Sequence, residues 1–239
     1  MITLASGSVG ELFTIPASEW TEINKRVGQV LATAPIKDYM ATVLSGYPAL
    51  LESCIQWQNS TFSGLISNSQ ELSNYCAVAI SDFSGLNAQV KEVIQSGSQN
   101  LPDSLKQETI ILLQKLNKDT SPVAAQSNLL SAEVLAFLNC NVTVDAQMAL
   151  FKDSLGTFWN PLGDTIKNLE AAAGHVTGVW SAITDDLNYT LGLPITVTIP
   201  FIESLNIDVA IASWQNVQAE AVGFPAMTVG QEQYWMNPF

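Results

Sequence analysis

Apolar residues return every three or four positions over long parts of the chain, which is the spacing of an α-helix that buries one face. Between Leu51 and Ile94 there is no proline and little charge, and the steps alternate between four and three, as in packed bundle helices. We therefore predict one continuous helix over residues 48–95. Its buried face is expected to hold Ile55, Gln58, Phe62, Leu65, Ser69, Leu72, Cys76, Ala79, Phe83, Leu86, Val90 and Val93.

Two further runs keep the same spacing and predict long helices over residues 122–159 and 163–191. The expected face of the first is Val123, Ser127, Leu130, Val134, Phe137, Asn141, Val144, Met148, Phe151, Leu155 and Phe158. The expected face of the second is Ile166, Leu169, Ala173, Val176, Trp180, Ile183, Leu187 and Leu191.

Shorter periodic segments predict four shorter helices, over residues 18–33, 37–45, 102–118 and 201–223. The closing helix is expected to bury Ile202, Leu205, Val209, Trp214, Val217 and Ala221. The only segment with the alternation of an extended strand is 195–199, "ITVTI". No long linker divides the chain, so residues 1–239 are predicted to form one all-α domain, an elongated antiparallel bundle of long helices.

The charge of the chain excludes one large class of partner. The chain has nine Lys and Arg residues and 22 Asp and Glu residues, which gives a formal net charge of -13, and no Lys or Arg follows Lys167. Because nucleic-acid binding depends on neutralising phosphates, we expect no nucleic-acid partner. The sequence also has no uninterrupted apolar run of about 18 residues, so no resting transmembrane helix is expected, and no signal peptide is visible in this chain.

Three cysteines, Cys54, Cys76 and Cys140, are too few for a disulfide scaffold. If the helix ending near residue 95 pairs with one starting near 122, and the segment 102–118 folds aside, facing residues have numbers that sum to about 217. This pairing predicts that Cys76 lies beside Cys140, either bonded or as free thiols. Three N-x-[ST] triplets, at Asn59, Asn141 and Asn188, are either glycan acceptors or chance matches.

The chain carries no recognisable catalytic or nucleotide-binding motif. Its single histidine, His175, adjoins core positions and is expected to be a partly buried structural residue. Asp185 and Asp186 are adjacent, so on a helix they point about 100° apart and do not form a carboxylate pair. We therefore predict no enzymatic activity, no catalytic residue, no metal site and no cofactor.

Most of the tryptophans fall on or beside core positions of the predicted helices. Trp57, Trp159, Trp180 and Trp214 are expected to fill the core. Trp235 stands in the aperiodic tail "QEQYWMNPF" and either docks into a groove or is an exposed aromatic contact for a membrane or partner.

Three segments resemble one family of proteins: "CIQWQNSTFSGLI", "LEAAAGHVTGVWSAITDDLNYTL" and "SWQNVQAEAVGF". In order and length of helices they are similar to the α-helical pore-forming toxins, which include cytolysin A, the haemolysin BL components and the xenorhabdolysins. The resemblance implies a secreted or extracellular protein, a membrane lipid or a toxin-partner protein as its target, and oligomers on membranes.

The chain departs from that family between its two longest predicted helices. Only residues 101–122 lie there, and "TIILLQKL" is too short to cross about 30 Å of hydrocarbon as a helix. We therefore expect a toxin-like or auxiliary protein with a reduced membrane-insertion element. A second apolar segment, residues 191–202, is either a small membrane-touching loop or buried against the bundle. The alternative function is a non-lytic bundle that binds a lipid, a hydrophobic surface or a protein.

Overall fold

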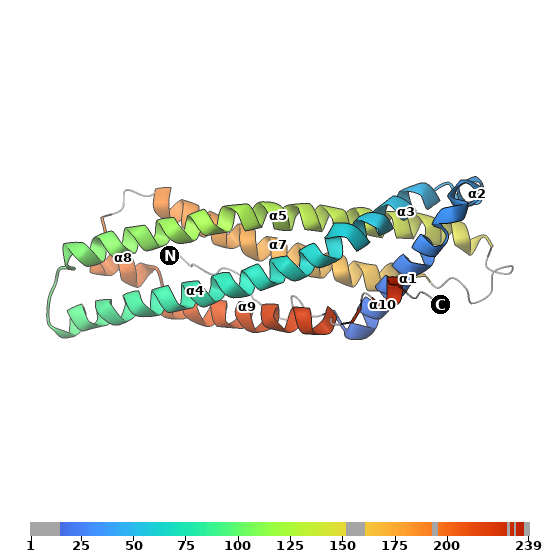
Figure 1. Cartoon of the computed structure of the whole chain (residues 1–239). Helices are drawn as coiled ribbons and strands as arrows, with labels where there is room; N and C mark the ends of the chain where they lie inside the picture. Colours follow the sequence, from blue (N-terminus) through green and yellow to red (C-terminus); the bar gives the residue numbers. More distant parts are fainter. Residues whose placement is uncertain (1–14, 152–160, 193–195, 229, 232, 237–239) are drawn as a thin grey trace. The chain divides into compact units, whose positions relative to one another are not determined.

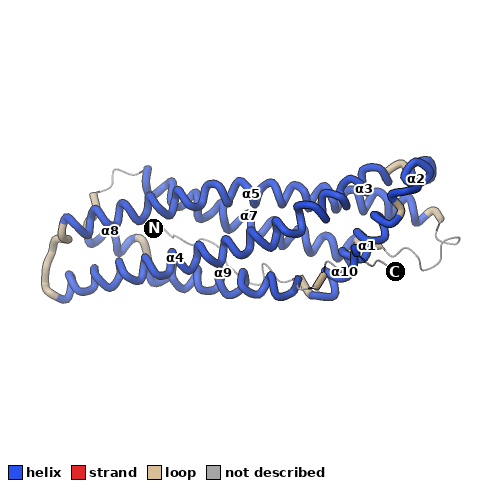
Figure 2. The backbone as a smooth tube through the Cα atoms, viewed as in Figure 1, coloured by secondary structure: helices blue, strands red, loops and turns tan. Residues whose placement is uncertain are grey.

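The computed structural model describes residues 15–151, 161–192, 196–228, 230–231 and 233–236, and all regular structure among them is helical (Figures 1 and 2). The predicted all-α helical bundle is confirmed. The elements are α1 (Ala17–Ala32), η1 (Ala34–Ile36), α2 (Lys37–Val43), α3 (Tyr47–Gln56), η2 (Trp57–Thr61), α4 (Phe62–Gln95), α5 (Asp103–Ala149), α7 (Gly163–Gly192), α8 (Ile199–Ser204), α9 (Ile207–Thr228) and α10 (Gln233–Met236).

The described residues belong to two compact units, and the four longest helices contribute to both. Unit 1 contains Asn68–Ser127 and Val176–Val222; unit 2 contains the residues from Ile15 to Ser67, Asn128–His175 and the residues from Gly223. The predicted single domain stays a prediction.

The core of unit 1 lies where α4 meets α7 and α9. The rings of Phe83 and Trp214 are 5.0 Å apart, and Tyr75 packs edge-on against Trp180 at 5.3 Å. Trp180 Nε1 donates a hydrogen bond of 3.1 Å to Asn68 Oδ1. This bond satisfies the polar edge of a fully buried indole. Trp180 and Trp214 are both buried, so their predicted core positions are confirmed.

The core of unit 2 is a cluster of aromatic rings around Phe62. Trp20, Trp57 and Trp235 lie 5.7, 6.1 and 5.0 Å from its ring centre. Trp57 also stacks on Phe137 at 5.0 Å. Trp235 is 9% exposed, so of the two predictions for the tail tryptophan, docking is confirmed. Trp159 lies outside the described residues.

The helix predicted over residues 48–95 is unbroken, but its buried face shifts by one residue near its start. Trp57–Thr61 form one turn of π-helix, which holds an extra residue per turn relative to the α-helix. From Phe62 to Val90 the predicted face is buried. At this point Cys54 and Trp57, the first residue of the π turn, are buried in place of Ile55 and Gln58, so the prediction that Ile55 and Gln58 are buried is wrong.

The prediction of a separate helix over residues 102–118 is also wrong, because α5 runs without interruption from Asp103 to Ala149 and contains Pro122. Pro122 is exposed, so the backbone carbonyl that loses its helical donor can be hydrated and the helix continues through it. The described helix ends at Ala149, earlier than the predicted end at 159, and residues 152–160 lie outside the described part of the chain.

The continuous α5 changes which residues of α4 and α5 face each other. In unit 1 Lys115 Nζ lies 3.0 Å from Asp82 Oδ2, and in unit 2 Thr61 Oγ1 donates to Glu133 Oε2 at 2.6 Å. The residue numbers of facing positions on α4 and α5 therefore sum to about 195. The sum stays constant along the pair because both helices rise by about 1.5 Å per residue. The predicted Cys76–Cys140 pairing is wrong.

All three cysteines are free thiols. Cys140 instead lies close enough to Cys54 for the two groups to interact electrostatically. Within each unit α4 and α5 therefore follow the same antiparallel register, which is set by the short connection 96–102.

Two smaller differences come from the C-terminal segments. Asn206, with φ of 47°, separates α8 from α9, so the helix predicted over 201–223 is two helices. Beyond this break Ile207 and Ala210 are buried and Val209 is 55% exposed, contrary to prediction. Residues 196–198 form no strand, because Thr198 caps α8 by accepting a hydrogen bond from the Phe201 N–H.

Other predicted core positions are only partly covered. Phe151 is 38% exposed, because it follows the last turn of α5. Four expected core residues are half-buried: Val93, Val123, Val176 and Leu191.

Candidate functional site

The residues singled out for possible chemistry stay apart in the structure. His175 is exposed on α7, so the prediction of a partly buried histidine is wrong. Asp185 is exposed, whereas Asp186 is half-buried, and burial followed by the charge of Asp185 raises its pKa. Among the described residues there is no group of three His, Cys, Asp or Glu side chains that could hold a metal ion.

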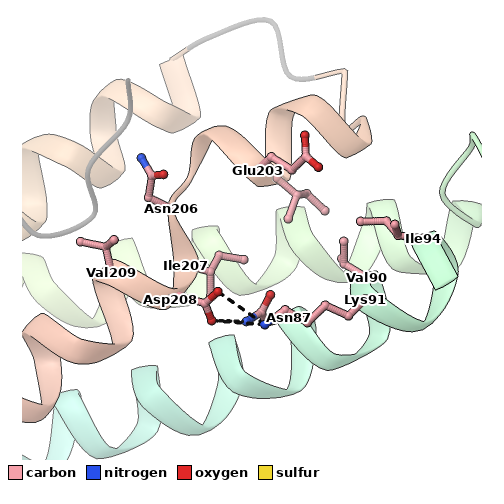
Figure 3. A pocket seen from close by; sticks show the side chains of 10 residues that line it. Asn87, Val90, Lys91, Ile94, Glu203, Asn206, Ile207, Asp208 and Val209 are labelled. Carbon is pink, nitrogen blue, oxygen red and sulfur yellow. Dashed lines mark hydrogen bonds and ion pairs between the residues drawn. The ribbon is translucent and has the colours of Figure 1, made fainter.

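Unit 1 has a groove of about 360 Å³ between α4 and the α8–α9 turn (Figure 3). Asn87 Nδ2 donates a hydrogen bond of 2.6 Å to Asp208 Oδ1, and Lys91 Nζ lies 3.4 Å from the same carboxylate. Val90, Ile94 and Ile202 supply the apolar part of the lining.

The polar groups of this groove are well hydrated. The side chains of Lys91 and Asp208 are 56% and 74% exposed, so their ion pair contributes little to stability. The lining offers one cation and two carboxylates, Asp208 and Glu203, with no buried polar group directed inward. We infer that the groove is a hydrated surface feature where α4 meets α9.

The more distinctive surface is the outward side of α5 in unit 2, here called the α5 face. Between Asn128 and Ala149 the exposed residues include no charged side chain. Leu129, Leu135 and Val142 are 67%, 43% and 45% exposed, and Leu150, which follows the helix, is 82% exposed. The α5 face consists of Asn128, Leu129, Ala132, Leu135, Ala136, Asn139, Val142, Thr143, Ala146 and Ala149.

Both charged residues of this segment are directed into the bundle. Glu133 accepts the hydrogen bond from Thr61, and Asp145 Oδ1 lies 3.0 Å from Nη1 of Arg26, the only arginine of the chain. Asp145 Oδ2 also accepts a hydrogen bond of 3.1 Å from the Leu162 N–H, one residue before α7. These bonds leave the α5 face without charge.

The Arg26–Asp145 ion pair is buried. The two side chains are 2% and 11% exposed, and Asn141 Oδ1 also accepts from Arg26 Nη1 at 3.3 Å. Burial lowers the pKa of Arg26, and the neighbouring carboxylate of Asp145 opposes that effect. Because a buried charge is costly without a partner, this pair fixes α1 against α5.

Further apolar side chains are exposed where the end of α5 meets the α2–α3 turn. The Gly46 N–H donates to Gln147 Oε1 at 3.1 Å, and Gln147 Nε2 donates to Ser45 Oγ at 2.7 Å. These bonds hold the start of α3 against α5. On η1 and α2, Ile36, Tyr39 and Val43 are 51%, 68% and 43% exposed.

By length and composition, α5 is the one helix among the described residues that could cross a membrane. A core helix can pass the same test, but such a helix is mostly buried, whereas only 33% of the apolar window of α5 is buried. This helix has no uninterrupted apolar run of about 18 residues, because Ser131, Glu133 and Asn139 interrupt it, so the sequence predicted no transmembrane helix here. The detectable signal is the absence of Lys and Arg from 119 to 151.

Comparison of the chain with protein-family models, with curated proteins and with solved structures finds no match.

Proposed function

We propose that the protein is a non-enzymatic, membrane-active protein that binds electrically neutral lipid bilayers through the α5 face of unit 2. The observation that carries this proposal is a largely exposed helix that is apolar enough for hydrocarbon and has no outward charge. The resemblance to α-helical pore-forming toxins supports the same class of function.

The composition of the α5 face favours lipid over a charged partner. It offers no cation or carboxylate for ion pairing, and its polar groups are the short side chains of Asn128, Asn139 and Thr143. Helices that anchor to anionic membranes use clusters of Lys and Arg. With a net charge of -13 and no basic residue on this face, the protein should prefer zwitterionic lipid and be repelled by anionic lipid.

The expected contribution of single residues follows from their exposure. Full burial of a leucine side chain is worth about 1.5–3 kcal/mol. Leu129 and Leu150 are 67% and 82% exposed, so each can still contribute about 1–2 kcal/mol on entering a bilayer. Since 1.4 kcal/mol corresponds to about a tenfold change in an equilibrium constant, replacing either should be measurable.

The test is flotation of the protein with phosphatidylcholine vesicles. We expect Leu129→Asp and Leu150→Asp each to lower the vesicle partition coefficient about tenfold or more, because the change removes apolar contact and adds a charge. Val222→Asp on α9 is the matched control, since Val222 is 60% exposed and belongs to unit 1. It should leave binding unchanged.

Two results would contradict the proposal. One is the absence of binding to phosphatidylcholine vesicles, which would favour the alternative of a non-lytic bundle with a protein partner. The other is binding that increases with the fraction of phosphatidylserine and is abolished by salt, because that behaviour indicates electrostatic attraction.

A further inference from the structure

We propose that in water the α5 faces of two copies of this chain pack on each other as an antiparallel pair, with the two-fold axis at Asn139. The pairing itself does not need the proposed function. Its consequence rests on that function: the lipid-binding surface stays covered until a bilayer replaces the second copy. On a chain with a net charge of -13, an uncharged helix face is a place where two copies can meet without like charges approaching each other.

The exposed residues of α5 in unit 2 repeat every seven positions. Exposed pairs begin at residues 128, 135, 142 and 149, and single exposed residues lie between these pairs at 132, 139 and 146. Steps of three and four are the spacing with which two helices pack side by side. The α5 face and Leu150 together make up this stripe, here called the α5 seam, and Asn139 is its middle residue.

The α5 seam is complementary to itself in an antiparallel arrangement. A two-fold axis at Asn139 places each residue opposite the one whose number brings the sum to 278, twice 139. Each large apolar side chain then meets a small or short one. Leu129 meets Ala149 of the second copy, Leu135 meets Thr143, Val142 meets Ala136 and Leu150 meets Asn128. Large side chains opposite small ones let the two helices approach closely and interdigitate.

Asn139 determines the register of the pair. On the axis it faces Asn139 of the second copy, and each amide can donate a hydrogen bond to the oxygen of the other. A shift of seven residues in either direction places Asn139 opposite Ala132 or Ala146, so the amide loses that partner. A single asparagine in such a seam specifies register and oligomeric state. The same shifts bring large side chains opposite each other, Leu129 with Val142 or Leu135 with Leu150.

The size of the α5 seam predicts a weak dimer. The seam has eleven residues in each copy, whereas a standard interface has about 20–30 residues on each side. The dissociation constant should therefore be micromolar or weaker. A weak dimer can be displaced by a bilayer. Salt should strengthen the dimer, because screening reduces the repulsion between two acidic copies and leaves the apolar contact intact.

Sedimentation equilibrium without lipid, over a wide range of protein concentration, measures the pairing. Asn139→Asp places two carboxylates at the axis and should raise the dissociation constant at least about tenfold. Asn59→Asp is the matched control, because Asn59 is exposed in η2 of the same unit and the change adds the same charge away from the seam. It should leave the dissociation constant unchanged.

Cross-linking with a short bismaleimide tests the axis and the direction of the pair. The variants carry Cys140→Ser, and the remaining thiols, Cys54 and Cys76, are buried. Asn139→Cys brings one thiol of each copy to the axis and should give cross-linked dimers. In an antiparallel pair the two copies of residue 129 lie about 30 Å apart along the helices. Leu129→Cys alone should therefore not cross-link, whereas its mixture with Ala149→Cys should.

Flotation with phosphatidylcholine vesicles tests the consequence for lipid binding. Asn139→Cys should float before cross-linking and should lose flotation after it, because each α5 face is then held against the other. Asn139→Cys treated with a monofunctional maleimide is the control for modification of the thiol.

The outcomes separate the pairing from the proposed function. A monomer at every concentration, equal dissociation constants for Asn139→Asp and Asn59→Asp, or a dimer that salt dissociates overturns the pairing. Cross-linking of Leu129→Cys with itself overturns the antiparallel arrangement. Flotation of the cross-linked protein overturns the covering of the lipid-binding surface. Absence of flotation by every form contradicts the proposed function, and the lipid-free measurements then decide the pairing by themselves.

Discussion

Phe62 is the central ring of the aromatic cluster in unit 2, and replacing it should cost more than replacing an equally buried phenylalanine elsewhere. Phe62 and Phe83 are 3% and 0% exposed and lie on the same helix. Phe62 contacts Trp20, Trp57 and Trp235, whereas Phe83 contacts Trp214. The variants Phe62→Leu and Phe83→Leu therefore differ mainly in the number of ring pairs lost.

The magnitude follows from that difference. An aromatic pair contributes about 0.5–1.5 kcal/mol beyond the burial of its area. Three pairs are lost in Phe62→Leu and one in Phe83→Leu, so Phe62→Leu should lower the free energy of unfolding by about 1–3 kcal/mol more. The loss of burial is similar in both because both side chains are almost fully covered.

Urea denaturation followed by far-ultraviolet circular dichroism measures the two costs. The comparison requires a single cooperative transition with equal m-values for both variants. If the two units unfold in separate transitions, each variant is compared within its own transition. A cost of Phe83→Leu equal to or greater than that of Phe62→Leu would refute the assignment of Phe62 as the centre of the cluster. Aspartate at either position should be more damaging still, because it buries an unpaired charge.

Further predictions concern Asp186 and the thiols. Asp186→Asn should raise the melting temperature at pH 7 by about 1–3 °C. Burial and the charge of Asp185 raise the pKa of Asp186, so ionised Asp186 destabilises the fold above its folded pKa, and this penalty disappears below its unfolded pKa. A gain in melting temperature of Asp186→Asn that persists at about pH 3 would contradict this explanation. In native protein a thiol reagent should modify half-buried Cys140 first. Burial raises the pKa of Cys54 and raises that of Cys76 to about 12, so rapid reaction of all three thiols would disprove their burial.

The sequence predicts the helices of this protein well because the signal is local. A spacing of three and four is a property of neighbouring turns, and it identifies the buried face of α4 from Phe62 to Val90 without knowledge of any partner. The same spacing finds α1 and α7 within about one residue of their ends. Aromatic residues on that face, such as Trp180, are correctly placed in the core for the same reason.

Helix boundaries inside a continuous helix are harder to predict. The prolines at 102 and 122 suggested a separate short helix, but Pro122 is tolerated in α5 because water can replace the missing donor on an exposed side. Because the two segments form one helix, the residue numbers of facing positions on α4 and α5 sum to about 195 and not to the predicted 217 or so. Cys140 therefore neighbours Cys54, and the prediction for Cys76 was wrong.

Only the tertiary structure determines which sides of an apolar helix are covered. From residue 128 onward α5 is apolar on several sides, so its sequence does not distinguish the buried Leu130 and Phe137 from the exposed Leu129 and Leu135. Contacts with Thr61 and Arg26 orient Glu133 and Asp145 inward and leave the α5 face uncharged. The π turn that begins at Trp57 likewise shifts the buried face by one residue, and the regular spacing of the sequence does not reveal it. Local spacing determines that a segment is helical, whereas long-range contacts determine its register and its exposed surface.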